Sequence, residues 1–247
     1  MPAPYQPTPE DIEWQSALAK LPKHQLSDTL CDAVSAGSVW RVQEALAAGA
    51  NARCNGGQPI RKAAVSGHLQ IAMLLTDAGA DLRINGEEPL CWAARDGNAA
   101  LVEFFLTRGA DEKSSGGRRA RSWAEDYNQQ APLFLLDHAE ELRENKRKTG
   151  LGLAEKALQD IETGTPLPMA DIKKNNVLGK IYLYALADAG QLDRLFDPKA
   201  WLGDLDGMNK FWTGMPKKYQ DKIDLPEKFA AVKREALKSM KIPKLKW

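Results

Sequence analysis

The stretch EPLCWAARDGN, residues 88–98, places a tryptophan, two adjacent alanines and a glycine in one short run. Related stretches occur at intervals of thirty residues: AVSAGSVWRVQEALAAGAN from Ala33, AAVSGHLQIAMLLTDAGAD from Ala63, and AARDGNAALVEFFLTRGAD from Ala93. A fixed period of this length is typical of a solenoid, in which each unit buries its apolar side against the next. The sequence therefore predicts a stacked repeat architecture.

Each unit predicts two short antiparallel helices. The glycines at 37, 67 and 97 suit the left-handed conformation that ends a first helix, and those at 49, 79 and 109 end a second one. The second helix carries apolar residues three positions apart on one face, namely Val42 and Ala45, Ala72 and Leu75, and Val102 and Phe105. Neither helix can bury its apolar side alone, so the units must stack.

These residues resemble the ankyrin repeat, whose pattern is T-P-L-H-x-A, a glycine, an apolar second helix and G-A-D. QPIRKAAVSG and EPLCWAARDG match it closely, with Pro59 and Pro89 in the first helical turn. The first unit, DTLCDAVSAG, has Thr29 in the proline position and Asp28 as its predicted N-cap. The resemblance covers residues 28–142 as about four units and implies an all-α, ankyrin-type helical solenoid.

The chain departs from the family pattern in two respects. The family histidine is replaced by other residues, which are Cys31, Arg61, Cys91 and Ser122. The period of thirty is also shorter than the usual ~33, and the missing residues come from the projecting finger. Asn85-Gly86 predicts a tight turn there. Short fingers would shift a binding surface towards the helices.

The segments that flank the three clear units predict further helices. RARSWAEDYNQQAPLFLLD fits a fourth, capping unit with Asn128 in place of the glycine, and its second helix is expected to continue through HAEELRENKRK. Residues 1–27 predict a mobile start and a capping helix with Thr8 as N-cap, and with Ile12 and Leu18 facing inward. Residues 150–247 predict an additional helical C-terminal domain, in which LYALADAGQLDRLF resembles one degenerate ankyrin helix pair.

Composition indicates a soluble globular protein, with 43% hydrophobic and 27% charged residues. Acidic residues exceed basic ones by five in residues 28–142, whereas basic residues exceed acidic ones by seven in residues 143–247. No apolar run approaches the roughly 20 residues that a membrane span needs. The N-terminus MPAPYQPTPE lacks the features of a signal peptide, so we expect a cytoplasmic protein without a membrane span.

The chain offers little to suggest catalysis. Cys31, Cys54 and Cys91 are widely spaced, which predicts reduced, buried thiols and no zinc site. His68 occupies the Gly-His position of an ankyrin repeat, where we expect a structural hydrogen bond to a neighbouring loop. LGDLDGMNK, from Leu202, superficially resembles a calcium loop but has the wrong spacing. We therefore expect no catalytic residues, no metal and no cofactor.

The resemblance implies a non-enzymatic scaffold that binds a partner protein on the concave face of the first helices. Positions five, two and one before each turn residue share one face of these helices. The predicted partner-binding residues on this face and on the adjoining finger are Lys62, Val65, Arg83, Glu87, Trp92, Arg95, Asp96, Trp123, Asp126 and Tyr127. The alternative is that Trp92 and Trp123 pack on the adjacent helix or under the C-terminal domain.

Two functional versions remain open on sequence grounds. The compact, two-part chain suits an inhibitor or immunity-type protein that masks a toxin or an enzyme. The alternative is nucleic-acid association through the basic C-terminal region, whose last segment, KFAAVKREALKSMKIPKLKW, is strongly basic. The basic residues of that segment are Lys228, Lys233, Arg234, Lys238, Lys241, Lys244 and Lys246. Aromatic residues that could stack on bases, although helical spacing favours a core role, are Trp201, Phe211, Trp212 and Tyr219.

Overall fold

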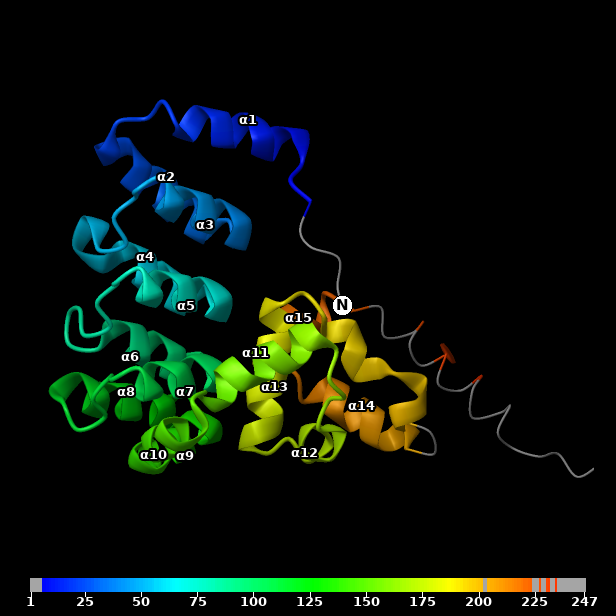
Figure 1. Cartoon of the computed structure of the whole chain (residues 1–247). Coiled ribbons are helices and arrows are strands. Elements are labelled where there is room, and N and C mark those ends of the chain that lie inside the picture. Colours follow the sequence, from blue (N-terminus) through cyan, green and yellow to red (C-terminus); the bar gives the residue numbers. More distant parts are fainter. Residues whose placement is uncertain (1–5, 202–203, 224–226, 228–229, 232–233, 235–247) are drawn as a thin grey trace, which may run out of the picture.

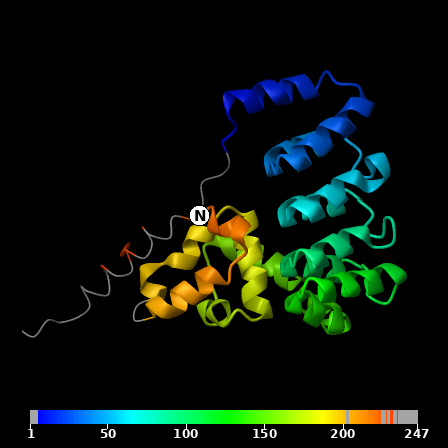
Figure 2. The same cartoon turned by 180° about the vertical axis from the view of Figure 1, so that it is seen from behind.

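The computed structural model describes residues 6–201, 204–223, 227, 230–231 and 234. Within these residues the regular structure is entirely helical. Paired helices stack along one direction from the N-terminus, and the later helices lie to one side of the lower part of the stack (Figure 1). The view from behind shows the same arrangement (Figure 2). The predicted all-α solenoid with additional C-terminal helices is confirmed.

Each repeat consists of an A helix and a B helix joined by a turn. The pairs are α2 (Lys23–Ser35) with α3 (Val39–Ala47), α4 (Cys54–Ser66) with α5 (Leu69–Asp77), α6 (Glu88–Arg95) with α7 (Ala99–Thr107), and α8 (Ser115–Asp126) with α9 (Gln130–Asp137). The A helices pack in sequence, α2 on α4, α4 on α6 and α6 on α8. Small residues permit this close approach, because the alanine of each A helix is buried: Ala33, Ala63, Ala93 and Ala124.

The turn between A and B helices requires a left-handed residue, and at Gly97 there is also no space for a side chain. Gly67 and Gly97 have φ of +80° and +71°. A Cβ on Gly97 would lie 2.2 Å from Oε1 of Gln129, which belongs to the next repeat. In the fourth unit Asn128 adopts φ of 54°, so asparagine takes the predicted glycine role there.

The fingers are short turns, as predicted. Asn85, Gly86 and Glu87 are all left-handed, with φ of 48°, 67° and 59°. The preceding finger has the same conformation at residues 55–57, where α4 is kinked before it continues as a regular helix. Three consecutive left-handed residues reverse the chain within one short turn, so the finger contains no paired hairpin. The absence of these hairpin residues accounts for the thirty-residue period.

Two sequence predictions about helix ends were wrong. α2 begins at Lys23, so Asp28 lies inside this helix and does not cap it. The second helix of the fourth unit ends at Asp137, and a separate helix, α10 (Ala139–Thr149), follows. His138 breaks the helix with φ of −107° and ψ of 21°, and its ring stacks on Phe134. The break lets α10 pack against α7.

The predicted N-terminal helix is present as α1 (Pro9–Leu18) and packs on α3. Thr8 caps it as predicted, and Leu18 is buried. The inward position expected for Ile12 was wrong, because this side chain is 53% exposed. Asp11 is the buried residue instead, and it accepts a hydrogen bond from Arg41 Nε of α3 at 2.9 Å.

The packing of α1 on α3 leads to a prediction for truncation. We expect deletion of residues 1–21 to destabilise the first repeat and to promote aggregation, because the apolar side of α3 would face water. Deletion of residues 1–7 should leave the melting temperature unchanged. Thermal melts followed by light scattering measure both effects. Equal stability and solubility of the longer truncation would show that α1 is not a cap.

The C-terminal helices pack on the B-helix side of the stack. They are α11 (Leu153–Thr163), α12 (Met169–Lys174), α13 (Val177–Asp188), the 3₁₀ segments η1 (Leu192–Phe196) and η2 (Pro198–Trp201), α14 (Leu205–Thr213) and α15 (Lys217–Gln220). α11 and α13 both contact α7, and one hydrophobic cluster extends without interruption from Leu18 to Ile223. Gly190 has φ of 66°, but a 3₁₀ turn follows it where an ankyrin unit would have a B helix. The resemblance of this segment to a helix pair therefore ends at Gly190.

Candidate protein-binding surface

The exposed side of the A helices forms one continuous surface, which we call the A-helix face. It consists of the predicted positions Asp32, Ser35, Ala36, Lys62, Val65, Ser66, Trp92, Arg95, Asp96, Trp123, Asp126 and Tyr127. Contacts between neighbouring helices show that these positions lie together. Lys62 Nζ donates to Ser35 Oγ at 2.8 Å, and the rings of Trp92 and Trp123 lie 5.4 Å apart between centroids.

Aromatic and cationic side chains alternate at the end of this face formed by α6 and α8. The guanidinium carbon of Arg95 lies 4.1 Å from the ring centroid of Trp92 and 6.0 Å from that of Tyr127. Arg119 lies 5.9 Å from the ring of Trp123 in the same way. Each cation–π contact contributes about 0.5–1 kcal/mol at exposed sites. The group is therefore ordered before any partner arrives.

Hydrogen bonds hold the side chains of this cluster in place, and part of the cluster remains exposed to solvent. Trp92 Nε1 donates to Glu88 Oε1 at 3.2 Å, and Arg95 Nε donates to Asp96 Oδ1 at 2.8 Å. Tyr127 is 59% exposed. Trp92 and Trp123 pack on each other across adjacent helices and remain half-buried, so the expected alternative of helix-to-helix packing is also part of the arrangement.

A hollow lies on the A-helix face between α2, α4 and α6. Its volume is about 350 Å³. The residues that line it are Ser35, Arg61, Lys62, Val65, Ser66, Glu88 and Trp92. From the sequence, Arg61 was noted only as a replacement for the family histidine, and it was not predicted to lie on the A-helix face. Its position next to Lys62 in the sequence could have indicated that Arg61 also reaches this face.

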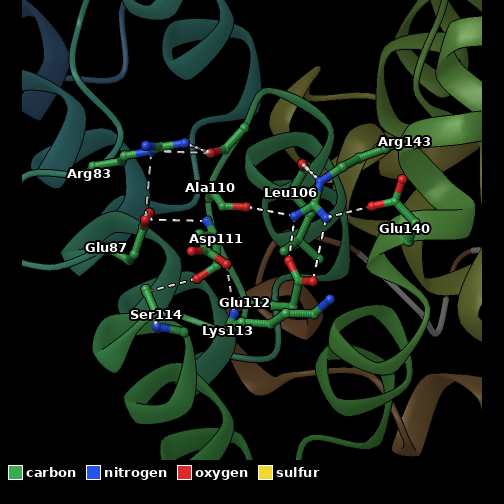
Figure 3. Close-up of polar contacts among 12 residues, drawn as sticks. Arg83, Glu87, Leu106, Ala110, Asp111, Glu112, Lys113, Ser114, Glu140 and Arg143 are labelled. Carbon is green, nitrogen blue, oxygen red and sulfur yellow. Dashed lines mark hydrogen bonds and ion pairs between the residues drawn. The ribbon is translucent and has the colours of Figure 1, made fainter.

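The finger residues Arg83 and Glu87 have different environments. Arg83 is exposed and donates from Nη2 to the Gly109 carbonyl oxygen at 3.0 Å, which ties one finger to the next. Glu87 is 2% exposed, and its Oε1 accepts from the Asp111 backbone N–H at 3.2 Å (Figure 3). The prediction that Glu87 contributes to a partner-binding surface was wrong, because the tight left-handed turn directs this side chain under the finger. Burial raises its pKa.

The finger between α7 and α8 is anchored to α10 by a second group of contacts. Arg143 donates to the carbonyl oxygens of Leu106 and Ala110 at 3.1 and 2.9 Å, and it forms an ion pair with Glu112 (Figure 3). The carbonyls at the end of α7 thus find a partner on another helix. This contact holds the edge of the A-helix face in place.

The junction between the repeats and the C-terminal helices contains a carboxylate that the sequence reasoning missed. Glu103 lies inside the otherwise apolar helix α7 and is fully buried. Its two oxygens accept from the backbone N–H groups of Leu153 and Ala154, at 2.8 and 3.0 Å. These are the first two residues of α11, so Glu103 satisfies donors that the helix cannot satisfy itself. An acidic residue within the apolar run ALVEFFL could have indicated a buried carboxylate with a structural role.

A second carboxylate completes the junction. Glu155 accepts from Arg108 Nη2 at 2.9 Å, from Lys146 Nζ at 3.0 Å, and from the Gly152 backbone N–H at 2.7 Å. Burial raises the pKa of Glu155, but these hydrogen bonds outweigh it and the net pKa is lowered. For Glu103 burial wins over the two backbone hydrogen bonds, and its pKa is raised.

The raised pKa of Glu103 predicts a pH dependence. At pH values between the pKa of Glu103 in the unfolded state and its higher pKa in the folded state, the folded protein binds more protons than the unfolded one. The stability that Glu103 contributes by binding its proton is therefore present at low pH and is lost as the pH rises through the folded-state pKa. We expect the unfolding free energy of wild type minus that of Glu103→Gln to decrease as pH increases from about 4.5. Urea titrations of both proteins at several pH values measure it. An increase of this difference with pH would contradict the assignment.

The remaining sequence-predicted groups have structural roles. His68 Nδ1 lies 3.5 Å from Asp188 Oδ1 of α13, so its partner is a helix and not the loop that was expected. Asp204 caps α14 by accepting from the Gly207 N–H, which accounts for the apparent calcium loop. The aromatic residues of the C-terminal region pack in or against the core: Trp201, Phe211, Trp212 and Tyr219.

The basic C-terminal segment lies almost entirely outside the described residues. Arg234 is described, whereas the other basic residues of the segment are not: Lys228, Lys233, Lys238, Lys241, Lys244 and Lys246. The alternative of nucleic-acid association therefore stays a prediction. A salt-sensitive mobility shift of DNA or RNA by the full chain is its test.

All three cysteines of the chain lie in the part that the structure describes. Cys31, Cys54 and Cys91 are free and buried, as predicted. In that part, no three His, Cys, Asp or Glu side chains are grouped so as to hold a metal ion. None of the described helices has the length and apolar character that crossing a membrane demands.

The stacked helix pairs, left-handed turns and exposed A-helix face define a helical repeat protein of the solenoid class. Residues 30–115, about a third of the chain, match the family model of ankyrin repeats in three copies. This part of the chain consists of ankyrin repeats, a family whose members generally bind other proteins and are typically not enzymes. A search of curated proteins gave no match.

Proposed function

We propose that the chain is a non-enzymatic binding module that holds a partner protein on the A-helix face. The observation that carries this proposal is the cluster of Trp92, Arg95, Trp123 and Tyr127, preassembled across two A helices and left partly open. Trp, Tyr and Arg dominate the energetics of protein interfaces. Ordered side chains also lose less entropy on binding, which favours affinity.

The short fingers support the same surface. The fingers of this chain end in tight turns, so they add little surface area of their own beside the A-helix face. The helices must then supply most of the contact. Val65, 41% exposed, and Tyr127, 59% exposed, are the most accessible large apolar side chains on the face.

The C-terminal helices leave this face open because they pack on the other side of the stack. Their main contacts with the repeats are made with α5, α7 and α9, which are B helices. At the edge of the face, the Tyr184 hydroxyl of α13 donates to the backbone carbonyl oxygen of Asp96 at 3.4 Å. A partner on the A helices would therefore not compete with the C-terminal helices.

We further propose that the module acts in the cytoplasm as an inhibitor or immunity-type protein. The three cysteines are buried and form no disulfide, which suits a reducing compartment. A protein of this kind forms a tight one-to-one complex, which size-exclusion chromatography with light scattering detects. Reversible binding to several unrelated proteins would instead indicate a general scaffold.

The experiment that tests the binding face uses three baits in parallel on one cytoplasmic extract. They are wild type, the double variant Arg95→Ala/Tyr127→Ala, and Phe134→Ala as a matched control. Phe134 is an aromatic residue that is 47% exposed on α9, outside the A-helix face. We expect mass spectrometry to find a protein that wild type and the control retain and the double variant loses. Retention by all three baits would contradict the proposal.

A further inference from the structure

We propose that the partner presents an acidic side chain beside an apolar one, and that the hollow between α2, α4 and α6 receives this pair. The inference rests on the proposed function, because it assigns a chemical class to the partner on the same face. It follows from the charges that line the hollow, from their existing partners, and from the apolar wall beside them.

Two cations of α4 reach the hollow without a strong anionic partner. Lys62 donates from Nζ to a neutral acceptor, Ser35 Oγ, and among the described residues no carboxylate lies within ion-pair distance of it. Arg61 has a carboxylate oxygen of Glu88 no closer than 3.8 Å, and its side chain is 39% exposed. A carboxylate brought between them would gain charge-assisted hydrogen bonds.

The acid of the hollow is already occupied. Glu88 accepts from Asn85 Nδ2 at 2.8 Å and from Trp92 Nε1 at 3.2 Å. Burial raises its pKa, but these hydrogen bonds outweigh that effect and the net pKa is lowered. Glu88 therefore orients Trp92 and compensates only one of the two cations. The hollow keeps an excess of one positive charge.

The opposite wall is apolar. Val65 is exposed, and the half-buried ring of Trp92 borders the same hollow. An aliphatic or aromatic side chain next to the acidic one would cover both. Burial of a side chain of this size contributes about 1.5–3 kcal/mol when it is complete.

The ends of the A-helix face carry acids, which limits what can bind along it. Asp32 on α2, a helix that lines the hollow, and Asp126 on α8, at the far end of the face, are both exposed. A nucleic-acid backbone repeats its negative charge along its length and would meet both acids. A peptide can place a single acidic residue between Arg61 and Lys62 and carry uncharged residues beside Asp32 and Asp126. Charge complementarity thus favours an acidic peptide segment of a protein.

The test selects random peptides displayed on phage against the full chain. Synthetic versions of the enriched sequences are then titrated against three variants of the chain. Arg61→Glu/Lys62→Glu reverses the charge of the hollow. Arg147→Glu/Lys148→Glu makes the same change of net charge on α10, where both side chains are well exposed. Arg95→Ala/Tyr127→Ala disables the rest of the face.

We expect the enriched peptides to share an Asp or Glu adjacent to an apolar residue. Reversal of the hollow should weaken their binding by about tenfold or more, whereas the α10 control should bind like wild type. Peptides without acidic residues that still lose affinity with Arg95→Ala/Tyr127→Ala would overturn the acidic class and leave the face intact. Binding that ignores every face variant, or no enrichment at all, would count against both proposals.

Discussion

Replacement of Gly116 by alanine is expected to destabilise the protein by about 3 kcal/mol, the upper part of the range for overpacking. A Cβ at this position would lie 1.9 Å from the Gly86 carbonyl oxygen and 2.4 Å from its carbonyl carbon. Both atoms belong to the backbone of the preceding finger, so they cannot move aside as a flexible side chain would. Within a helix, alanine is otherwise about 1 kcal/mol better than glycine.

The expected sign is therefore opposite to intrinsic helix propensity, which makes the measurement decisive. Urea unfolding of Gly116→Ala gives the effect. The matched control is Ser115→Ala, the exposed neighbour at the start of α8, which should change stability by less than about 0.5 kcal/mol. A neutral or stabilising Gly116→Ala would mean that the finger and α8 are not packed as described.

Replacement of Glu103 by alanine is expected to cost about 3 kcal/mol. The change removes the acceptors of two backbone N–H groups at the start of α11 and leaves a space in a fully buried site. Glu103→Gln is the matched control, because it keeps the volume and one acceptor oxygen. We expect it to cost clearly less at neutral pH.

Unfolding of wild type and of Glu103→Ala also shows whether the repeats and the C-terminal helices unfold together. One hydrophobic cluster spans both parts, which predicts a single unfolding transition for wild type. Glu103→Ala should lower the midpoint of that transition. Circular dichroism and tryptophan fluorescence measure it, and well-separated transitions in wild type would contradict the continuous core. The predicted division at residues 142–150 would then describe separable domains.

The repeats could be predicted from the sequence because their signals are local and periodic. Gly37, Gly67, Gly97 and Asn128 mark left-handed turns, and each was placed correctly. The short finger also followed from the Asn85-Gly86 pair and the reduced period. The break at His138 could not be predicted from local sequence signals, because the direction of α10 depends on its packing against α7.

Residues whose roles depend on packing between distant segments were the ones missed. Glu87 was assigned to the surface by its place in the finger, yet its left-handed backbone turns it inward. Glu103 gained a role only from α11, which is fifty residues further along the chain. The A-helix face was easier to predict, since helical spacing places Trp92 and Arg95 on one side of α6 and the repeat places Tyr127 at the matching side of α8.

We propose that the A-helix face holds the partner. The most direct test of this proposal is isothermal titration of the isolated partner with wild type and with Arg95→Ala, Tyr127→Ala and the double variant. We predict that each single change weakens binding by about 1 kcal/mol or more while thermal stability changes little. Unchanged affinity of the double variant would place the binding site elsewhere on the molecule and contradict the claim.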